Sequence, residues 1–303
     1  FVAHGGRDMT LTDLLDKLKV SRQALHRPMR QLLDQNLVAL MPVPSNSADA
    51  QYRPMANVDE MIDTIDGSRE SHEFLFGWVD AMATGKDLGR GSLELANLAP
   101  DDVGVAPEPA TKRIRFEPPS AALHPAILRR ITDRRFRKMP AAGWGARVNL
   151  RPFLFPIDNI VGFNRIYGKR GFYSIHTGFP RETQRAGIVA VMEAITAARA
   201  GSFAAVMKPM RGPGEGLLSF PMEGMAYAID LPRRTGVEAL HKEIERITLD
   251  HDGRLYIAKD ALMTAETFAA MFPRLDEFRE VLARIDPDGR FQSDMGRRLG
   301  LHP

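Results

Sequence analysis

The sequence predicts an α+β protein: a ferredoxin-like antiparallel sheet with helices on one face, preceded by a small partial winged helix-turn-helix. Three observations lead to this fold class. From residue 171 the predicted elements follow the order β-α-β-β-α-β, and both helices of that order carry an apolar stripe at helical spacing. The first 56 residues instead show two short helices, then two strands around a polar loop. We therefore expect two domains, residues 1–56 and residues 57–303.

The composition excludes several classes of protein. The chain is 44% hydrophobic and 26% charged with a net charge of +3, which is ordinary for a globular protein and demands no polyanionic partner. It has no cysteine, so disulfides and thiolate metal sites are excluded, and a reducing, cytoplasmic location is expected. No apolar run approaches the roughly 20 residues of a membrane span. The histidines show no metal-ligand spacing, and we expect no metal site.

The front of the chain has the pattern of a winged helix-turn-helix. Thr10 can cap a helix that runs through Leu18, and Ser21 can cap a second helix to about Gln35. Pro28 lies inside the second helix and should kink it. The polar residues expected at the exposed start and face of that helix are Arg22, Gln23, Arg27 and Arg30.

Two segments of this front part, Met9-Thr-Leu-Thr-Asp-Leu-Leu and Val20-Ser-Arg-Gln-Ala-Leu-His-Arg-Pro-Met-Arg-Gln-Leu-Leu, are similar to the multiple-antibiotic-resistance regulator (MarR) family. The resemblance implies a helix that enters the major groove of DNA and contacts phosphates and base edges. It covers about 55 residues and lacks the flanking helices through which that family dimerises. We therefore expect DNA binding, if it occurs, to be weak.

The long part is predicted in detail from its periodicity. The expected strands are 73–79, 172–179, 203–208, 225–231 and 254–258. The expected helices are 58–65, 124–139, 181–200 and 236–250, and a last one over 265–285 that Pro273 kinks or splits. The basic run Arg134–Lys138 is interpreted as a solvated face of its helix.

Candidate site residues lie at the ends and on one face of these strands. Lys259 is expected at a strand end with Tyr256 three residues earlier, where a cation could stabilise negative charge on a cofactor or substrate. His176 alternates with Ser174 on one strand face as a candidate acid/base or substrate contact, and Lys208 ends the strand before Pro209. Each also has a plain structural interpretation, as a solvated lysine, a core aromatic residue or a structural histidine.

The long part also resembles the substrate-binding (cap) half of FAD-linked oxidoreductases of the vanillyl-alcohol-oxidase type. Within that type it is similar to the decaprenylphosphoryl-ribose 2′-oxidase and D-arabinono-lactone-oxidase groups. The matching segments include Trp78-Val-Asp-Ala-Met-Ala-Thr-Gly-Lys-Asp-Leu-Gly-Arg-Gly, Tyr256-Ile-Ala-Lys-Asp and Ser293-Asp-Met-Gly-Arg-Arg. The resemblance implies FAD as the cofactor, with Lys259 and Tyr256 over the pyrimidine edge of the flavin, Lys208 facing the substrate, and Trp78 as a wall of the pocket.

The sequence departs from this family in the polar residues expected around the substrate. Ser174 and His176 stand where two glutamines are common, and Ala226 and Ala228 stand where asparagine and cysteine are common. The resemblance implies oxidation of a secondary hydroxyl of a sugar, sugar lactone or sugar lipid by hydride transfer to flavin. The alternatives are a winged-helix transcription regulator with a ligand-sensing cap-like domain, and an inactive remnant.

The chain begins at Phe1 rather than Met, and nothing in it matches the FAD-binding domain of this family. We therefore expect FAD to bind weakly to this chain alone, and we expect a separate FAD-binding chain as a candidate partner. Whether the chain is a fragment or a fusion stays open at this point, as do the exact substrate, the electron acceptor and the oligomeric state.

Overall fold

The structure is a computed structural model that describes residues 47–100, 106–107 and 109–302. The chain divides into two compact units, Phe1–Asn46 and Ser47–Pro303. The helix-turn-helix expected in the front part, with Arg22, Gln23, Arg27 and Arg30, therefore lies outside the described residues and stays a prediction. The second unit is described below.

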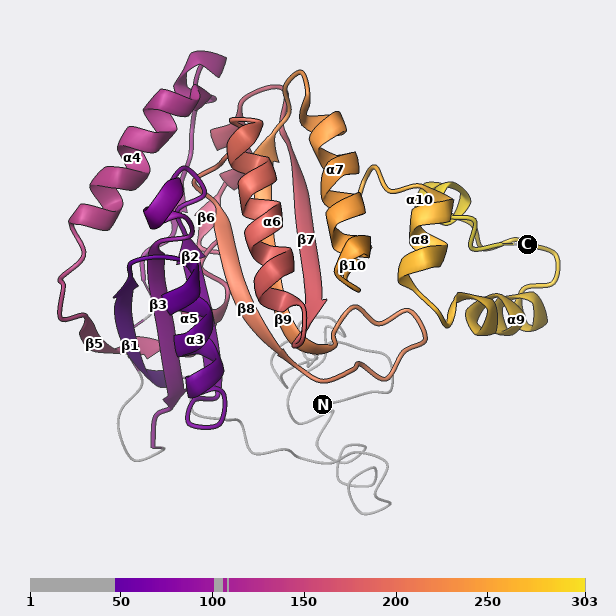
Figure 1. The fold of residues 1–303 in the computed structure, drawn as a ribbon, viewed down its shortest axis with the longest axis horizontal. Helices are drawn as coiled ribbons and strands as arrows, with labels where there is room; N and C mark the ends of the chain where they lie inside the picture. Colours follow the sequence, from indigo (N-terminus) through magenta and orange to yellow (C-terminus); the bar gives the residue numbers. More distant parts are fainter. Residues whose placement is uncertain (1–46, 101–105, 108, 303) are drawn as a thin grey trace, which may run out of the picture. The chain divides into compact units, whose positions relative to one another are not determined.

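The second unit is built on an eight-stranded antiparallel sheet, drawn in Figure 1, in the order β10-β7-β9-β8-β2-β3-β1-β5. Its first four strands are β10 (Arg254–Leu255), β7 (Phe172–Pro180), β9 (Glu223–Pro232) and β8 (Ala205–Arg211). They are connected through α6 (Gln184–Ala197) and α7 (Val237–Asp250) in the sequence β-α-β-β-α-β. The antiparallel α+β fold predicted for this region is confirmed.

The other half of the sheet corrects the expected domain boundary at residue 56. Its strands are β2 (Phe74–Val79), β3 (Gly91–Leu98), β1 (Ser47–Met55) and β5 (Trp144–Asn149). β1, interpreted from the sequence as part of a wing, pairs with β3 on one side and β5 on the other. An alternating strand has the same local pattern in a wing and in a larger sheet, so its partners could not be predicted from the segment alone. Two further short strands, β4 (Lys112–Arg113) and β6 (Ile160–Val161), pair in parallel.

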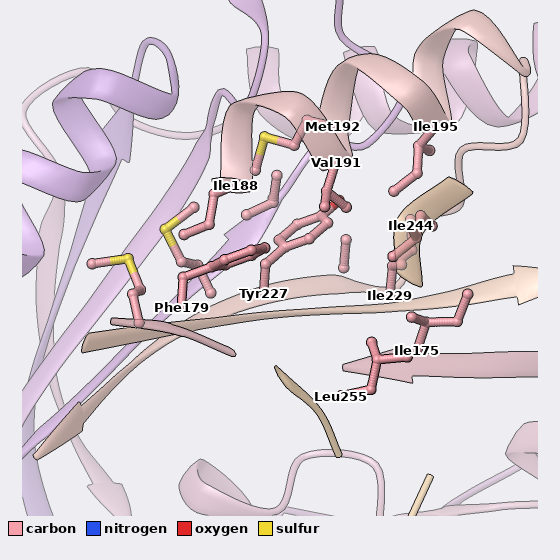
Figure 2. Packing of buried hydrophobic residues seen from close by; sticks show 14 of the residues in the cluster. Ile175, Phe179, Ile188, Val191, Met192, Ile195, Tyr227, Ile229, Ile244 and Leu255 are labelled. Carbon is pink, nitrogen blue, oxygen red and sulfur yellow. The ribbon is translucent and has the colours of Figure 1, made fainter. Parts of the chain in front are cut away.

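Three helices, α3 (Val58–Ser68), α6 and α7, cover one face of the sheet (Figure 1). α3 begins at Asn57, whose side-chain oxygen accepts a hydrogen bond of 2.9 Å from the Glu60 amide. Figure 2 shows the resulting core, in which apolar side chains of the helices meet alternate residues of the strands. The labelled members are Ile175, Phe179, Ile188, Val191, Met192, Ile195, Tyr227, Ile229, Ile244 and Leu255.

The C-terminal segment adds α8 (Ala265–Met271), α9 (Leu275–Ile285) and α10 (Asp294–Arg298). The expected long helix is split at Pro273, as one of the two predicted outcomes. The segments between β2 and β7 also contain two helices, α4 (Pro125–Arg137) and α5 (Leu150–Leu154). They contain three 3-10 helices as well, η1 (Gly85–Asp87), η2 (Ser120–Leu123) and η3 (Phe163–Tyr167). Within the described ranges, none of the helices is both long and apolar enough to cross a membrane.

Candidate functional site

The face of the sheet opposite the helices carries the candidate site. Because Ile175 and Ile229 point into the helix-covered core, the residues next to them along β7 and β9 point to the other face. Strand pairing then sets Ser174 opposite Asp230 and His176 opposite Ala228. On the neighbouring strand, Lys208 lies opposite Ala226. The expectation that Ser174 and His176 share one face is met, and the sheet brings Lys208 within two strands of them.

Lys259 lies in a turn rather than at the end of a strand, which corrects the prediction. β10 ends at Leu255, and the Tyr256 amide donates to the His176 carbonyl at 2.9 Å. The Lys259 amide then donates to the Tyr256 carbonyl at 3.0 Å, which closes a turn. The turn brings the Tyr256 ring to 5.9 Å from the His176 ring, so two predicted site residues are neighbours.

Phe220 packs against Tyr256 at the site, in space that Gly178 leaves free. The Phe220 ring centre is 4.9 Å from that of Tyr256. A Cβ atom at Gly178 would lie 2.9 Å from the Phe220 ring, so any side chain at this position would push the ring away. The glycine is therefore needed for the close packing of Phe220 against the open face.

Asp230 is a site residue that the sequence analysis missed. The Ser174 hydroxyl donates to its Oδ1 at 2.6 Å, and the Tyr167 hydroxyl donates to its Oδ2 at 3.4 Å. Ser174 Oγ also lies 3.3 Å from Nε2 of His176. Burial raises the pKa of the Asp230 carboxyl, while the hydrogen bonds from Ser174 and Tyr167 oppose that shift. The position of Asp230 on the same face as Ala226 and Ala228 was the available signal.

The electrostatics of the site keep His176 neutral. Burial lowers the pKa of His176 to about 4, and the positive charges of Lys259 and Lys208 add to the shift. Partial burial and the charge of Lys259 lower the pKa of Lys208 as well. At neutral pH the site therefore combines a neutral imidazole with cationic side chains on one face.

Trp78 is buried rather than open to this cluster, with 5% of its surface exposed. Its indole nitrogen donates to the Phe203 carbonyl at 2.9 Å, and the Arg135 guanidinium lies over its ring at 3.9 Å. The basic residues Arg134, Arg135, Arg137 and Lys138 are exposed, as expected for a solvated helix face, and Arg135 in addition makes a cation–π contact with the Trp78 ring. Substrate contact by Trp78 stays a prediction.

Glu94 lies on the same part of the sheet and was not singled out from the sequence. It is opposite Tyr52 on β1, and Tyr52 stacks on Trp144 with ring centres 4.7 Å apart. Burial raises the pKa of Glu94 to about 7, although the nearby charge of Arg135 opposes the shift. A carboxyl group of this kind changes its charge near neutral pH.

A second charged group lies behind the Tyr256–Lys259 turn. His241 of α7 has Nδ1 at 2.8 Å from Glu245 and Nε2 at 3.2 Å from Asp260. Arg298 of α10 donates to the other oxygen of Asp260 at 2.9 Å. We call these four residues, His241, Glu245, Asp260 and Arg298, the Asp260 cluster. They come from three separate segments of the chain, so no local sequence pattern could predict that they meet.

The residues of the open face fit a planar cofactor that becomes anionic on reduction, such as the isoalloxazine ring of FAD. Lys208 and Lys259 supply positive charge, and the small side chains of Ala226 and Ala228 leave room above the strands between them. Within the described ranges, no group of histidine and acidic side chains could hold a metal ion. Lys259 and Tyr256 would contact the ring system, and Lys208 would face the space beside it.

Comparison with known proteins points to sugar oxidases. Residues 225–299 match the family model described as D-arabinono-1,4-lactone oxidase. The chain is 34% identical over 247 residues to the decaprenylphosphoryl-β-D-ribose oxidase of Mycolicibacterium smegmatis, an alignment that covers 78% of this chain and 53% of that protein. It is 27% identical over 280 residues to an uncharacterised protein in the mprA 5′ region of Streptomyces coelicolor, covering 86% of this chain and 75% of that protein.

Two solved structures match most of this chain at low similarity. They are the xylooligosaccharide oxidase from Myceliophthora thermophila C1 in complex with xylobiose, at 13% identity and a TM-score of 0.49, and FgChi7B, at 11% identity and a TM-score of 0.48. The matches cover 86% of this chain in both cases, and 56% and 57% of those chains. Both TM-scores lie below 0.5, too low to decide between fold families.

The chain spans about half the length of the mycobacterial relative. The resemblance of the long part to FAD-linked sugar oxidases, first seen in Tyr256–Asp260 and Ser293–Arg298, is confirmed by the family match and by this relative. The chain is thus similar to a decaprenylphosphoryl-ribose oxidase and, through residues 225–299 with the Tyr256–Lys259 turn among them, to the D-arabinono-1,4-lactone oxidase family model.

Proposed function

We propose that residues 47–303 form the substrate-binding part of an FAD-linked oxidoreductase that oxidises a secondary hydroxyl of a sugar-type substrate. The observation that carries this proposal is the grouping of Lys208 and the neutral His176 on one open face of the sheet, with the Tyr256–Lys259 turn beside them. The similarity to enzymes named as a lactone oxidase and a ribose oxidase supports it. We place the protein in the cytoplasm as part of the same proposal.

FAD, when bound, supplies the acceptor for the hydride that leaves the carbinol carbon. The fixed charge of Lys259 stabilises negative charge that develops at the edge of the ring system, without reorganising during the reaction. Tyr256 packs beside His176 and keeps water from that edge. Lys208, which lies on β8, binds oxygen atoms of the substrate.

His176 is the candidate base that takes the proton from the substrate hydroxyl. The proton of the Ser174 hydroxyl is used in its 2.6 Å hydrogen bond to Asp230. Ser174 Oγ therefore accepts from Nε2–H of His176, at 3.3 Å, and fixes the tautomer with Nδ1 as the free acceptor. The hydroxyl proton goes to Nδ1, the hydride leaves the carbon, and a ketone remains.

A cavity beyond the ends of β7 and β9 supports an anionic substrate. It has a volume of about 580 Å³, and Tyr167, which donates to Asp230, is part of its wall. Its charged walls carry four cations against the single carboxylate of Glu117; the cations are Lys169, Arg170, Arg233 and Arg234. Among the proposed substrates, a sugar with a phosphoryl group, free or lipid-linked, matches this charge best.

The proposal is tested by anaerobic bleaching of the flavin absorbance. The chain is supplied with FAD directly or through a separate FAD-binding chain, and neutral sugars, sugar lactones and phosphorylated sugars are added in turn. We expect bleaching with at least one of them, and a loss of bleaching in His176→Ala but not in Lys242→Ala, a change on the outer side of α7. Absence of bleaching with every substrate in the FAD-loaded protein contradicts the proposal.

The alternative of a DNA-binding regulator rests on residues 1–46, which lie outside the described residues. No observation in residues 47–302 favours it. It stays a prediction, and salt-dependent DNA binding by the colourless protein would support it.

A further inference from the structure

The turn that carries Tyr256 and Lys259 is attached to the rest of the protein through the residue that follows it. The carboxylate of Asp260 accepts hydrogen bonds from the amides of Leu262, at 3.3 Å, and Met263, at 3.1 Å. On its other side it meets His241 Nε2 at 3.2 Å and Arg298 Nη1 at 2.9 Å. Asp260 is therefore bound from α7, from α10 and from its own loop.

The Asp260 cluster is buried and charged. The side chains of Asp260 and His241 are 2% and 3% exposed, while that of Arg298 is 29% exposed. Burial opposes the protonation of His241, but its contacts with Asp260 and Glu245 outweigh burial and raise its pKa. A buried group of this kind contributes little net stability relative to an apolar core of the same shape. Its value to the protein therefore lies in the geometry that it imposes on the turn.

That geometry reaches the candidate site through Lys259. The Lys259 amide donates within the turn, to the Tyr256 carbonyl, and its side chain is exposed but close enough for its charge to act on His176 and Lys208. The direction of the ammonium group therefore depends on how the turn is held. The nearest anchor along the chain is the adjacent Asp260 carboxylate.

We propose that Asp260 is the positioning residue of the Tyr256–Lys259 turn, and that His241 and Arg298 hold its carboxylate so that the Lys259 ammonium stays beside His176 and Lys208. Arg298 adds a second contact, from the same guanidinium nitrogen to the Met263 carbonyl. It thereby ties the C-terminal segment to the site. The consequence for catalysis rests on the proposed function, whereas the positioning itself is a property of this chain alone.

His176 reports the position of Lys259 without any flavin. After burial, the largest cause of its lowered pKa is the charge of Lys259, followed by that of Lys208. If the turn is released and the ammonium moves away from His176, the pKa of His176 rises toward its ordinary value. A merely structural role of the cluster would change stability and leave this pKa as it is.

The experiment is an NMR titration of the His176 ring in the full chain. We expect Lys259→Ala to raise the pKa of His176 by on the order of 1 unit, and Arg298→Gln and Asp260→Asn to raise it in the same direction. Arg298→Lys keeps a positive charge and should restore part of the shift. Arg297→Gln, a change on the outer side of the same helix, is the matched control and should leave the pKa unchanged.

Arg298→Gln decides the outcome where Asp260→Asn fails to fold, because Arg298 is partly exposed and its loss leaves Asp260 bound to His241. An unchanged His176 pKa in folded Arg298→Gln overturns the proposal, and so does an unchanged pKa in Lys259→Ala. Because no flavin is present, these results are separate from the proposed oxidase activity. A chain that bleaches flavin but shows no pKa shift refutes the positioning role alone.

Discussion

Replacing His241 by alanine should destabilise the unit of residues 47–303 strongly. The imidazole lies between Glu245 at 2.8 Å and Asp260 at 3.2 Å, and the two carboxylates are 8% and 2% exposed. Without the imidazolium they remain as two buried negative charges, and among the described residues Arg298 and Thr267 are then their side-chain partners. Removing one partner of a buried ionic group costs about 3–5 kcal/mol.

The expected loss can be measured by urea unfolding of the full chain followed by circular dichroism. A loss of about 3–5 kcal/mol corresponds to a fall in Tm of roughly 10 °C for a unit of this size. His72→Ala, which changes a histidine in an outer loop, is the matched control and should cost less than about 1 kcal/mol.

The contribution of His241 to the stability of the fold should depend on pH. A histidine with a raised pKa in the folded state contributes stability that is fully present below its unfolded pKa of about 6.5 and is lost as the pH rises through the folded pKa. The wild-type chain should therefore lose stability on the alkaline side of pH 6.5, and His241→Ala should lack this loss. A destabilisation below about 1 kcal/mol, or an unchanged alkaline limb, would refute the account of the cluster.

Three further predictions follow from single features of the fold. Because β1 lies between β3 and β5, a chain of residues 47–303 should melt cooperatively, whereas residues 57–303 should not; equal melts would show that β1 is dispensable. Burial raises the pKa of Glu94 to about 7, so the charged form of Glu94 destabilises the fold at pH values above the pKa of the unfolded state. In the same urea experiment, Glu94→Gln should be more stable than wild type by on the order of 1 kcal/mol at pH 8, with no gain at pH 4. Gly178→Val should displace Phe220 from Tyr256, and intrinsic tyrosine fluorescence that stays unchanged would count against this packing.

The ferredoxin-like part of the fold could be predicted from the sequence because its information is local. The apolar stripes of α6 and α7 and the alternation along β7 are complete within each segment. The placement of β1 could not be predicted, because strand pairing is decided by residues far apart in the chain. The same reason explains why the shared face of Ser174 and His176 was predicted, whereas their partner Asp230 on β9 was missed.

The expected strand over 254–258 shows a second limit. Its residues have strand-like character, yet the chain turns after Leu255, because Asp260 is bound by His241 and by amides of its own loop. A contact made across the fold thus overrides the local preference. The site role of Lys259 stays a prediction, and the element expected to hold it is corrected from a strand end to a turn.

The reductive half-reaction tests most directly whether the open face beside the Tyr256–Lys259 turn receives the flavin. Stopped-flow reduction of the FAD-loaded protein by its substrate should be slower in Lys259→Ala by on the order of 10²-fold, as with other preorganised charge stabilisers. Lys259→Arg should recover only part of the rate, because a planar guanidinium replaces a compact ammonium group. Lys242→Ala should reduce flavin at the wild-type rate. An unchanged reduction rate in folded, FAD-loaded Lys259→Ala would contradict the account.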